Sequence, residues 1–408
     1  MIRFFEAKLE NGLTVIAEVN PEARSAAMGY FVRTGARDER KEESGVSHFL
    51  EHMVFKGPEE MDAYAVNLAF DELGAQYNAF TSEENTVYYG AVLPELLPEL
   101  LTLFTKLMRP ALREADFEME RKVILEEIAL YKDRPDFVAY ERARERYFRG
   151  HPLANRVLGT LESIRAMTRE QMAAYHARRY VPGNMVLAFA GRLDWERVLD
   201  LSARLTEDWR PGEAGRDHPP FRPEPARFRE PYARARQTYL VGLYPGFSAR
   251  DERRYVASVL ASVLGDAGSS RLHWALVDKG LVEQAGAGHE EHDELGTLAV
   301  YATTRPENRA EVAGILEKEL DRLASEPPTE EEIARAKTKA KTQIVFAGET
   351  PMRRLFHLGL SYAYTGRYEP LSEVLRKVEA VRREDVAGYL AERPFYQGVF
   401  FELVPGEG

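Results

Sequence analysis

The chain repeats a short charged segment at a distance close to half its own length. Residues 36–40 read Ala-Arg-Asp-Glu-Arg, and residues 249–253 have the same five amino acids, 213 positions further along a chain of 408. A strand-like run precedes each copy, at 29–33 and at 239–243, and a helical pattern follows each one. This shared context at this spacing predicts that one structural unit occurs twice.

A proline-rich, charged segment lies between the two predicted copies. Residues 210–229 have the composition of a semi-rigid, extended linker. A chain of this length is also expected to form more than one domain of ordinary size. We therefore expect a first domain over 1–209, a linker over 210–229, and a second domain of the same fold over 230–408.

Strand and helix patterns in the first half predict the fold class. Strand patterns occur at 13–18 and 26–33, and residues 77–90 have the pattern of a hairpin. Helical periodicity covers 44–56, 60–75, 93–108, 114–132, 136–148 and 168–180. Strands at both ends with helices between them indicate an α+β fold. We expect two similar α/β domains whose sheets are mainly antiparallel and flanked by helices.

Composition narrows the chemistry that such a fold can carry. The chain contains no cysteine, so any transition-metal site must use His, Asp and Glu. A net charge of −11 without a basic block argues against nucleic-acid binding, because contacts to phosphates dominate that affinity. No apolar run approaches the ~18 residues that span a bilayer. The first residues lack the pattern of a signal peptide, so we expect a cytoplasmic protein without membrane contact.

The segment His48-Phe49-Leu50-Glu51-His52 has the spacing of a helical metal site. Residues four apart lie one turn apart on the same face of a helix, so His48 and His52 can reach one cation. Glu51 lies beside them and can accept a proton from a metal-bound water. The alternative is a helix that carries two surface imidazoles. The pentad is too specific for that alternative to be preferred.

A third ligand is expected, because a catalytic zinc commonly has three protein ligands and one open position. Wound at 100° per residue, the helix predicted over 114–132 places Phe117, Ile124 and Ile128 on one apolar stripe. Glu120 and Glu127 fall at its edge, where a carboxylate is costly to bury unless it is paired or binds a metal. We therefore predict Glu127 as the ligand and Glu120 as its support. Salt bridges to Arg121 or Lys122 are the alternative.

These residues resemble the inverzincin zinc peptidases, the group that includes pitrilysin and the mitochondrial processing peptidase. The likeness begins with residues 48–53 and 120–128 and continues through shorter segments at 34–39, 45–47, 55–57, 78–82 and 180–186. The two-domain length is most similar to the β subunit of the processing peptidase. The resemblance covers the whole chain, strongly in the first half and more loosely in the second.

The resemblance implies a fold, an activity and a set of roles. It implies two similar domains in a clam-shell arrangement around a chamber. It implies a zinc metalloendopeptidase that hydrolyses unfolded peptides, with one Zn²⁺ per chain. In this family His48, His52 and Glu127 would bind the zinc, Glu51 would be the general base, and Glu120 would support the site. A substrate peptide would add as a strand beside Asn78, Ala79 and Phe80.

The second half departs from the family pattern in two ways. At the 213-residue offset, Ala261, Leu264 and Gly265 stand where the first half has His48, Glu51 and His52. Single-chain relatives in that family carry an Arg and a Tyr seven residues apart in the second half, where this chain has Val277 and then Glu283 or Gln284. We therefore expect a homodimer, or a heterodimer with a related chain that supplies the Arg/Tyr pair. A rival hypothesis is a non-catalytic structural or chaperone-like subunit.

Three other patterns are given structural interpretations. The cluster His289-Glu290-Glu291-His292 lies among glycines and is predicted to be an exposed turn between strands. Residues 330–340 form a charged helix that we expect to be solvated. Four aromatic residues are predicted to belong to the core and not to contact a ligand: Tyr147, Phe148, Tyr175 and Tyr180.

Overall fold

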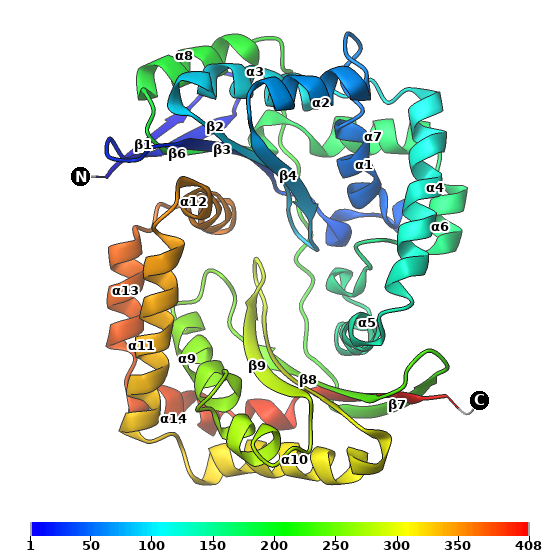
Figure 1. Ribbon diagram of the computed structural model, residues 1–408, viewed down its shortest axis with the longest axis vertical. Coiled ribbons are helices and arrows are strands. Elements are labelled where there is room, and N and C mark those ends of the chain that lie inside the picture. The colour runs from blue at the N-terminus through cyan, green and yellow to red at the C-terminus, as the bar shows by residue number, and fades with distance from the viewer. Residues whose placement is uncertain (1, 407–408) are drawn as a thin grey trace. The chain divides into compact units, whose positions relative to one another are not determined.

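The computed structural model describes residues 2–406, and the chain forms two compact units. The first unit contains residues 1–128, 155–217 and 346–369. The second contains residues 129–154, 218–345 and 370–408. Both units combine one twisted sheet with helices (Figure 1). Within the described residues, no helix is both long enough and apolar enough to cross a membrane.

The sheet of the first unit has six strands in the order β1-β2-β6-β3-β5-β4. Strand β2 runs parallel to β6, and the other neighbours are antiparallel. The strands are β1 (Arg3–Lys8), β2 (Thr14–Val19), β3 (Ala26–Val32), β4 (Gln76–Thr81), β5 (Thr86–Val92) and β6 (Met185–Gly191). Because β4 pairs only with β5, it forms one edge of the sheet.

The sheet of the second unit reproduces this topology. Its order is β7-β11-β8-β10-β9, with β7 and β11 parallel and the other pairs antiparallel. The strands are β7 (Ala226–Tyr232), β8 (Thr238–Gly246), β9 (Gln284–Glu291), β10 (Gly296–Thr304) and β11 (Val399–Pro405). The order and the relative directions of these five strands match those of β2-β6-β3-β5-β4 in the first sheet. Strand β1 has no counterpart in the second sheet. The predicted fold class, two similar domains with mainly antiparallel sheets, is confirmed.

Helices cover both sheets. The first half of the chain forms α1 (Val46–Val54), α2 (Ala63–Glu72), α3 (Leu97–Leu107), α4 (Glu114–Tyr131), α5 (Pro135–Tyr147), α6 (Leu161–Ala166), α7 (Arg169–Arg179) and α8 (Trp195–Leu205). The second half forms α9 (Arg254–Gly265), α10 (Arg309–Ser325), α11 (Glu330–Ala347), α12 (Pro351–Thr365), α13 (Leu371–Ala380) and α14 (Arg383–Ala391). Several begin at an Asp or Thr whose side chain accepts a hydrogen bond from a backbone N–H of the first turn, as Asp62 and Thr168 do.

Helices α5 and α12 are exchanged between the two halves of the chain. Helix α5, from the first half, packs on β8 and β11 of the second sheet. Helix α12, from the second half, packs on β3 and β6 of the first sheet (Figure 1). Gly359 permits the second contact, because a Cβ there would lie 2.2 Å from the Phe31 ring. The packing therefore differs from the contiguous division expected from the sequence, 1–209 and 230–408.

The predicted linker is shorter than expected and is attached to the first unit. Strand β7 starts at Ala226, inside the range 210–229, because alternating residues there pair with β11. Before that, the carbonyl of Gly215 accepts a hydrogen bond from Arg179 at 2.7 Å, and the carbonyl of Asp217 accepts one from Arg37 at 2.9 Å. Residues up to 217 are therefore held by the first unit.

Two of the remaining predictions concern burial. The four aromatic residues predicted to belong to the core are indeed buried: Tyr147, Phe148, Tyr175 and Tyr180. The prediction for the cluster at 289–292 was wrong. His289 lies within strand β9, and its Nε2 accepts a hydrogen bond from the backbone N–H of Phe247 at 3.1 Å. Gly286 serves close packing instead of a turn, since a Cβ there would lie 2.5 Å from the Tyr301 hydroxyl.

Candidate metal centre

Helix α1 carries the paired histidines, and a buried carboxylate holds its first turn. The two oxygens of Glu39 accept hydrogen bonds from the backbone N–H groups of Gly45 and Ser47, at 2.7 and 2.8 Å. These donors are among the groups that a helix leaves unsatisfied at its N-terminus. Burial raises the pKa of Glu39 to about 8, although the two backbone hydrogen bonds oppose that rise. Gly45 has a φ of 90°, a left-handed conformation that favours glycine.

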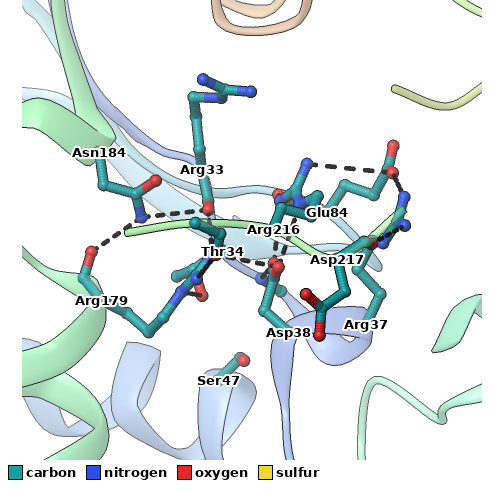
Figure 2. Close-up of polar contacts among 12 residues, drawn as sticks. Arg33, Thr34, Arg37, Asp38, Ser47, Glu84, Arg179, Asn184, Arg216 and Asp217 are labelled. Atoms are coloured by element: carbon teal, nitrogen blue, oxygen red, sulfur yellow. Dashed lines mark hydrogen bonds and ion pairs between the residues drawn. The ribbon is translucent and has the colours of Figure 1, made fainter. Parts of the chain in front are cut away.

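A buried polar network supports the helix from the opposite side. The Tyr175 hydroxyl lies 2.7 Å from both Ser47 Oγ and Thr34 Oγ1, and Arg179 donates to Thr34 Oγ1 at 3.0 Å. Figure 2 shows Thr34 and Arg179 beside a cluster of charged side chains. There Asp38 pairs with Arg179 at 3.1 Å and with Arg216 at 2.8 Å. The repeated segment at 36–40 therefore anchors the metal helix.

Charges in this cluster are almost completely buried but all have partners. Arg37 pairs with Glu84 at 2.5 Å, and their side chains are 2% and 1% exposed. Arg216 donates to the carbonyl of Glu84 at 2.5 Å (Figure 2). Removing one member of such a cluster leaves an uncompensated buried charge, which is strongly destabilising. The loop before α1 is therefore held in a defined position.

The structure brings His48, His52 and Glu127 together. The Nε2 atoms of the two imidazoles lie 3.8 and 3.7 Å from Glu127 Oε2, and the ligand atoms of all three residues lie within 4.8 Å of one another. These separations are too long for hydrogen bonds. They fit one cation between the groups, because zinc–ligand distances of about 2.0–2.2 Å put neighbouring tetrahedral ligands roughly 3.4 Å apart.

The protonation of this group also fits a metal. Burial lowers the pKa of His48 to about 3, helped by the charge of His52, so its imidazole is neutral near pH 7. His48 Nδ1 is buried and has no hydrogen-bond partner among residues 2–406. Nε2 is therefore the atom that this ring offers to the group. Burial also raises the pKa of Glu127, whose side chain remains 27% exposed.

Glu120 orients the second imidazole. Its Oε1 lies 2.8 Å from His52 Nδ1, and its Oε2 lies 2.6 Å from Lys56 Nζ. A hydrogen bond from Nδ1 leaves Nε2 with the lone pair that a metal requires. Burial would lower the pKa of His52, but the hydrogen bond and charge of Glu120 outweigh it and raise that pKa. Burial would raise the pKa of Glu120, but its hydrogen bonds to His52 and Lys56 outweigh burial and lower that pKa.

Lys56 is a contributor that the sequence analysis did not single out. It follows His52 by four residues, in the turn directly after α1, and this spacing is the signal that could have identified it. The alternative partners considered for the two glutamates are not the ones observed. Arg121 pairs with Glu118 at 3.0 Å and donates to the carbonyl of Met167 at 2.9 Å.

Glu51 lies beside the ligand group and is tied to the edge strand. Its Oε2 accepts a hydrogen bond from Thr81 Oγ1 at 2.5 Å, so α1 is connected to the end of β4. Burial raises the pKa of Glu51, and the bond to Thr81 opposes that rise. Thr81 was also missed, although it directly follows the residues predicted to bind substrate. Its role depends on β4 lying next to α1, which local patterns do not encode.

The residues predicted to bind a substrate lie on the edge strand β4. Asn78 is exposed, Ala79 is buried, and Phe80 is half-buried. The backbone N–H of Ala79 donates to Asn78 Oδ1 at 2.9 Å. A peptide that paired through this N–H would have to displace the Asn78 side chain.

The second repeat cannot build the same group. Ala261 and Leu264 are buried in the core of the second unit. A Cβ on Gly265 would lie 2.1 Å from the backbone nitrogen of Ala287, so no side chain fits where the first repeat has His52. Helix α11, which starts 216 residues after α4, has Gln343 at the position of Glu127. Within the described residues, His48, His52 and Glu127 form the one group of at least three such residues close enough to hold a metal.

Comparisons with known proteins show which family the chain is similar to. The model of the Insulinase family (Peptidase family M16) matches residues 14–161, and that of the Peptidase M16 inactive domain matches residues 166–340. A Mycobacterium bovis protein described as an uncharacterized zinc protease is 33% identical, over 93% of this chain and 88% of its own length. One from Rickettsia felis with the same description is 30% identical, over 93% and 92%.

The fold of nearly the whole chain is similar to that of a solved structure. The crystal structure of a protease from Helicobacter pylori matches with a TM-score of 0.91 at 22% identity, covering 99% of this chain and 100% of that one. Together with the relatives above, this shows that the chain belongs to the M16 peptidase family. The relatives of this chain in that family include proteins named zinc proteases.

Proposed function

We propose that this chain is a zinc metalloendopeptidase, or the catalytic subunit of one, that cleaves unfolded peptides. His48, His52 and Glu127 hold one zinc per chain, and Glu51 is the general base. The observation that carries the proposal is the convergence of two imidazole nitrogens on one oxygen of Glu127, at 3.8 and 3.7 Å. When bound, zinc supplies Lewis-acid polarisation of a carbonyl and lowers the pKa of a water molecule.

The residues of the chain supply the proton transfer and the positioning. Glu51 accepts the proton of the attacking water and passes it to the leaving amine. Its raised pKa brings it closer to the pH at which it works, which favours a base that must later act as an acid. Thr81 holds one oxygen of Glu51, and Glu120 with Lys56 holds His52.

Edge strand β4 is the proposed platform for the substrate. An extended peptide that added to β4 would run past Thr81 and therefore past Glu51. Asn78, Ala79 and Phe80 would contact it chiefly through backbone groups. Such recognition depends little on side chains, which suits an enzyme that acts on varied unfolded segments.

A partner subunit is the second part of the proposal. Val277 packs against the core of the second unit, and Gln284 Nε2 donates to Thr303 Oγ1 at 3.4 Å. Neither is the Arg or Tyr found in relatives at the corresponding positions. In a heterodimer a related chain would supply that pair, whose absence can cost ~10² or more in rate. A homodimer would have to act without it. The same observation favours the second candidate function, a structural subunit without turnover.

One set of measurements separates these candidates. The purified chain is assayed for bound zinc and for cleavage of a quenched-fluorescent peptide library, alone and with any partner that co-purifies. Glu51→Gln should keep the zinc and lower turnover by about 10²–10⁴-fold. His48→Ala should lose both, whereas Glu126→Gln, an exposed neighbour on α4, should lose neither. Zinc binding without cleavage of any peptide, in every subunit combination, would leave the structural candidate standing and refute the enzyme.

A further inference from the structure

Four arginines surround a cavity in the first unit that has no part in the proposed peptidase chemistry. Arg3 lies on β1, Arg24 between β2 and β3, and Arg192 and Arg197 follow β6 at the start of α8. They line a cavity of about 730 Å³. Figure 1 shows α8 and α3 together over this side of the sheet. The cavity volume lies within the range of about 300–1,000 Å³ typical of small-molecule sites.

The protein neutralises the positive charge of this cavity only in part. All four arginines are exposed, and among residues 2–406 none of their guanidinium groups forms an ion pair or hydrogen bond. Arg3 makes only a cation–π contact with Phe5, at 5.4 Å. Two carboxylates share the lining, Glu95 and Asp194, and Asp194 already caps α8. The cavity is therefore a cationic site on a chain whose net charge is −11.

The surroundings of the arginines are preorganised. Val19, Leu97 and Val198 are buried beneath the cavity. Three proline residues in its lining fix the local backbone: Pro21 in a loop, Pro94 at the start of a 3-10 helix and Pro98 in the first turn of α3. The arginines come from segments far apart in the sequence and meet because β1, β2, β6 and β3 are neighbours in the sheet. Binding here would require little ordering of the backbone.

The cavity is separate from the candidate metal centre. Strand β3 starts beside the loop that holds Arg24 and runs for seven residues, about 20 Å, toward the loop that precedes α1. Thr81, which contacts Glu51, is at the opposite end of the sheet from Leu93 and Pro94, because β4 and β5 are antiparallel. The two sites therefore occupy opposite ends of one sheet.

We propose that this cavity binds a small polyanion that carries at least two phosphate groups. A guanidinium presents a planar fork that binds phosphate oxygens in pairs. Four guanidinium groups and two carboxylates leave the lining with two positive charges, which is more than one monovalent anion can neutralise. Inorganic tripolyphosphate and a nucleoside triphosphate share this chemistry. Leu93, which lines the cavity and is 56% exposed, gives a nucleoside an apolar surface that tripolyphosphate would leave uncovered.

Calorimetric titration of the zinc-loaded chain tests the proposal at fixed ionic strength. We expect saturable binding of tripolyphosphate at one site per chain, weakened at least tenfold by Arg24→Ala/Arg192→Ala and also by Arg3→Ala/Arg197→Ala. Arg305→Ala/Arg335→Ala removes two exposed, unpaired arginines of the second unit and should change nothing. Chelation of the zinc by tripolyphosphate would affect all variants equally. It therefore cannot produce a loss of binding that is confined to the cavity variants.

Comparison of ATP with tripolyphosphate identifies the source of the phosphates. Tighter binding of ATP supports a nucleotide, and equal or weaker binding supports an inorganic polyphosphate. The proposal is overturned if the control pair weakens binding as much as the cavity pairs do. It is also overturned if sulfate at matched ionic strength gives the same heats as tripolyphosphate, or if neither polyphosphate nor ATP binds at millimolar concentration.

Discussion

The two repeats share one topology, yet only the first has room for a metal centre. In the first, α1 carries two imidazoles beside β4, and α4 brings Glu127 to them. In the second, α9 packs so closely on β9 that position 265 accepts nothing larger than glycine. The comparison shows that a fold does not determine a site. The separation between one helix and one edge strand decides whether polar side chains fit between them.

The largest effect is expected from a substitution that gives α4 the residue found at the corresponding position of α11. Glu127→Gln should abolish tight zinc binding and peptidase activity, because a neutral amide replaces a charged ligand. The loss should exceed the roughly 100-fold that changes beyond the direct ligands produce. Zinc content by mass spectrometry and peptide cleavage report it. The reciprocal Gln343→Glu should alter neither quantity, and an equal effect in both repeats would contradict the assignment.

A smaller effect is expected from the residue that orients His52. Glu120→Ala copies Ala336 of the second repeat and removes the partner of both His52 and Lys56. Zinc affinity should fall about 10–100-fold, measured by competition with a chelator. Glu118→Ala, on the same helix and paired only with Arg121, is the matched control. Unchanged affinity in Glu120→Ala would show that the carboxylate does not act on the metal centre.

The close packing of the second repeat can be tested through stability. Gly265→Ala places a methyl group against Ala287 and should lower the free energy of unfolding by about 1–3 kcal/mol. Gly314→Ala, in α10 with nothing within 4 Å, should instead raise it by about 0.5–1 kcal/mol. Chemical denaturation of both variants checks the opposite signs. A stabilised Gly265→Ala would mean that α9 and β9 can separate.

The smallest difference concerns the repeated charged segment. Glu39 is buried with a pKa raised to about 8, whereas Glu252 is exposed and pairs with Lys377 at 2.9 Å. A carboxyl whose pKa is higher in the folded state contributes stability below about pH 4.5, which is lost as pH rises toward 8. Glu39→Gln should therefore flatten the fall in stability between these pH values. Glu252→Gln should leave it unchanged, as urea midpoints across this range would show.

Local patterns predicted the three residues that the structure brings together at the candidate metal centre, but not everything around them. The i, i+4 spacing of His48 and His52 and the winding of the helix that holds Glu127 depend only on helix geometry. The contact of Thr81 with Glu51 depends on which strand lies beside α1. The exchange of α5 and α12 was also not predicted, since the apolar face of a helix does not specify which sheet it covers. The glycines at 286 and 296 were taken for turn residues, although they serve close packing.

The exchanged helices make the two halves of the chain depend on each other. A first half expressed alone would lack α12 and would leave Phe31, Val186 and Ala188 facing water. A second half alone would lack α5 over Val241, Leu243 and Phe401. A single backbone cut between residues 218 and 225 would therefore leave a nicked but associated protein, not two free domains. An ancestral duplication that has exchanged helices in this way can no longer be divided into two independently folding proteins.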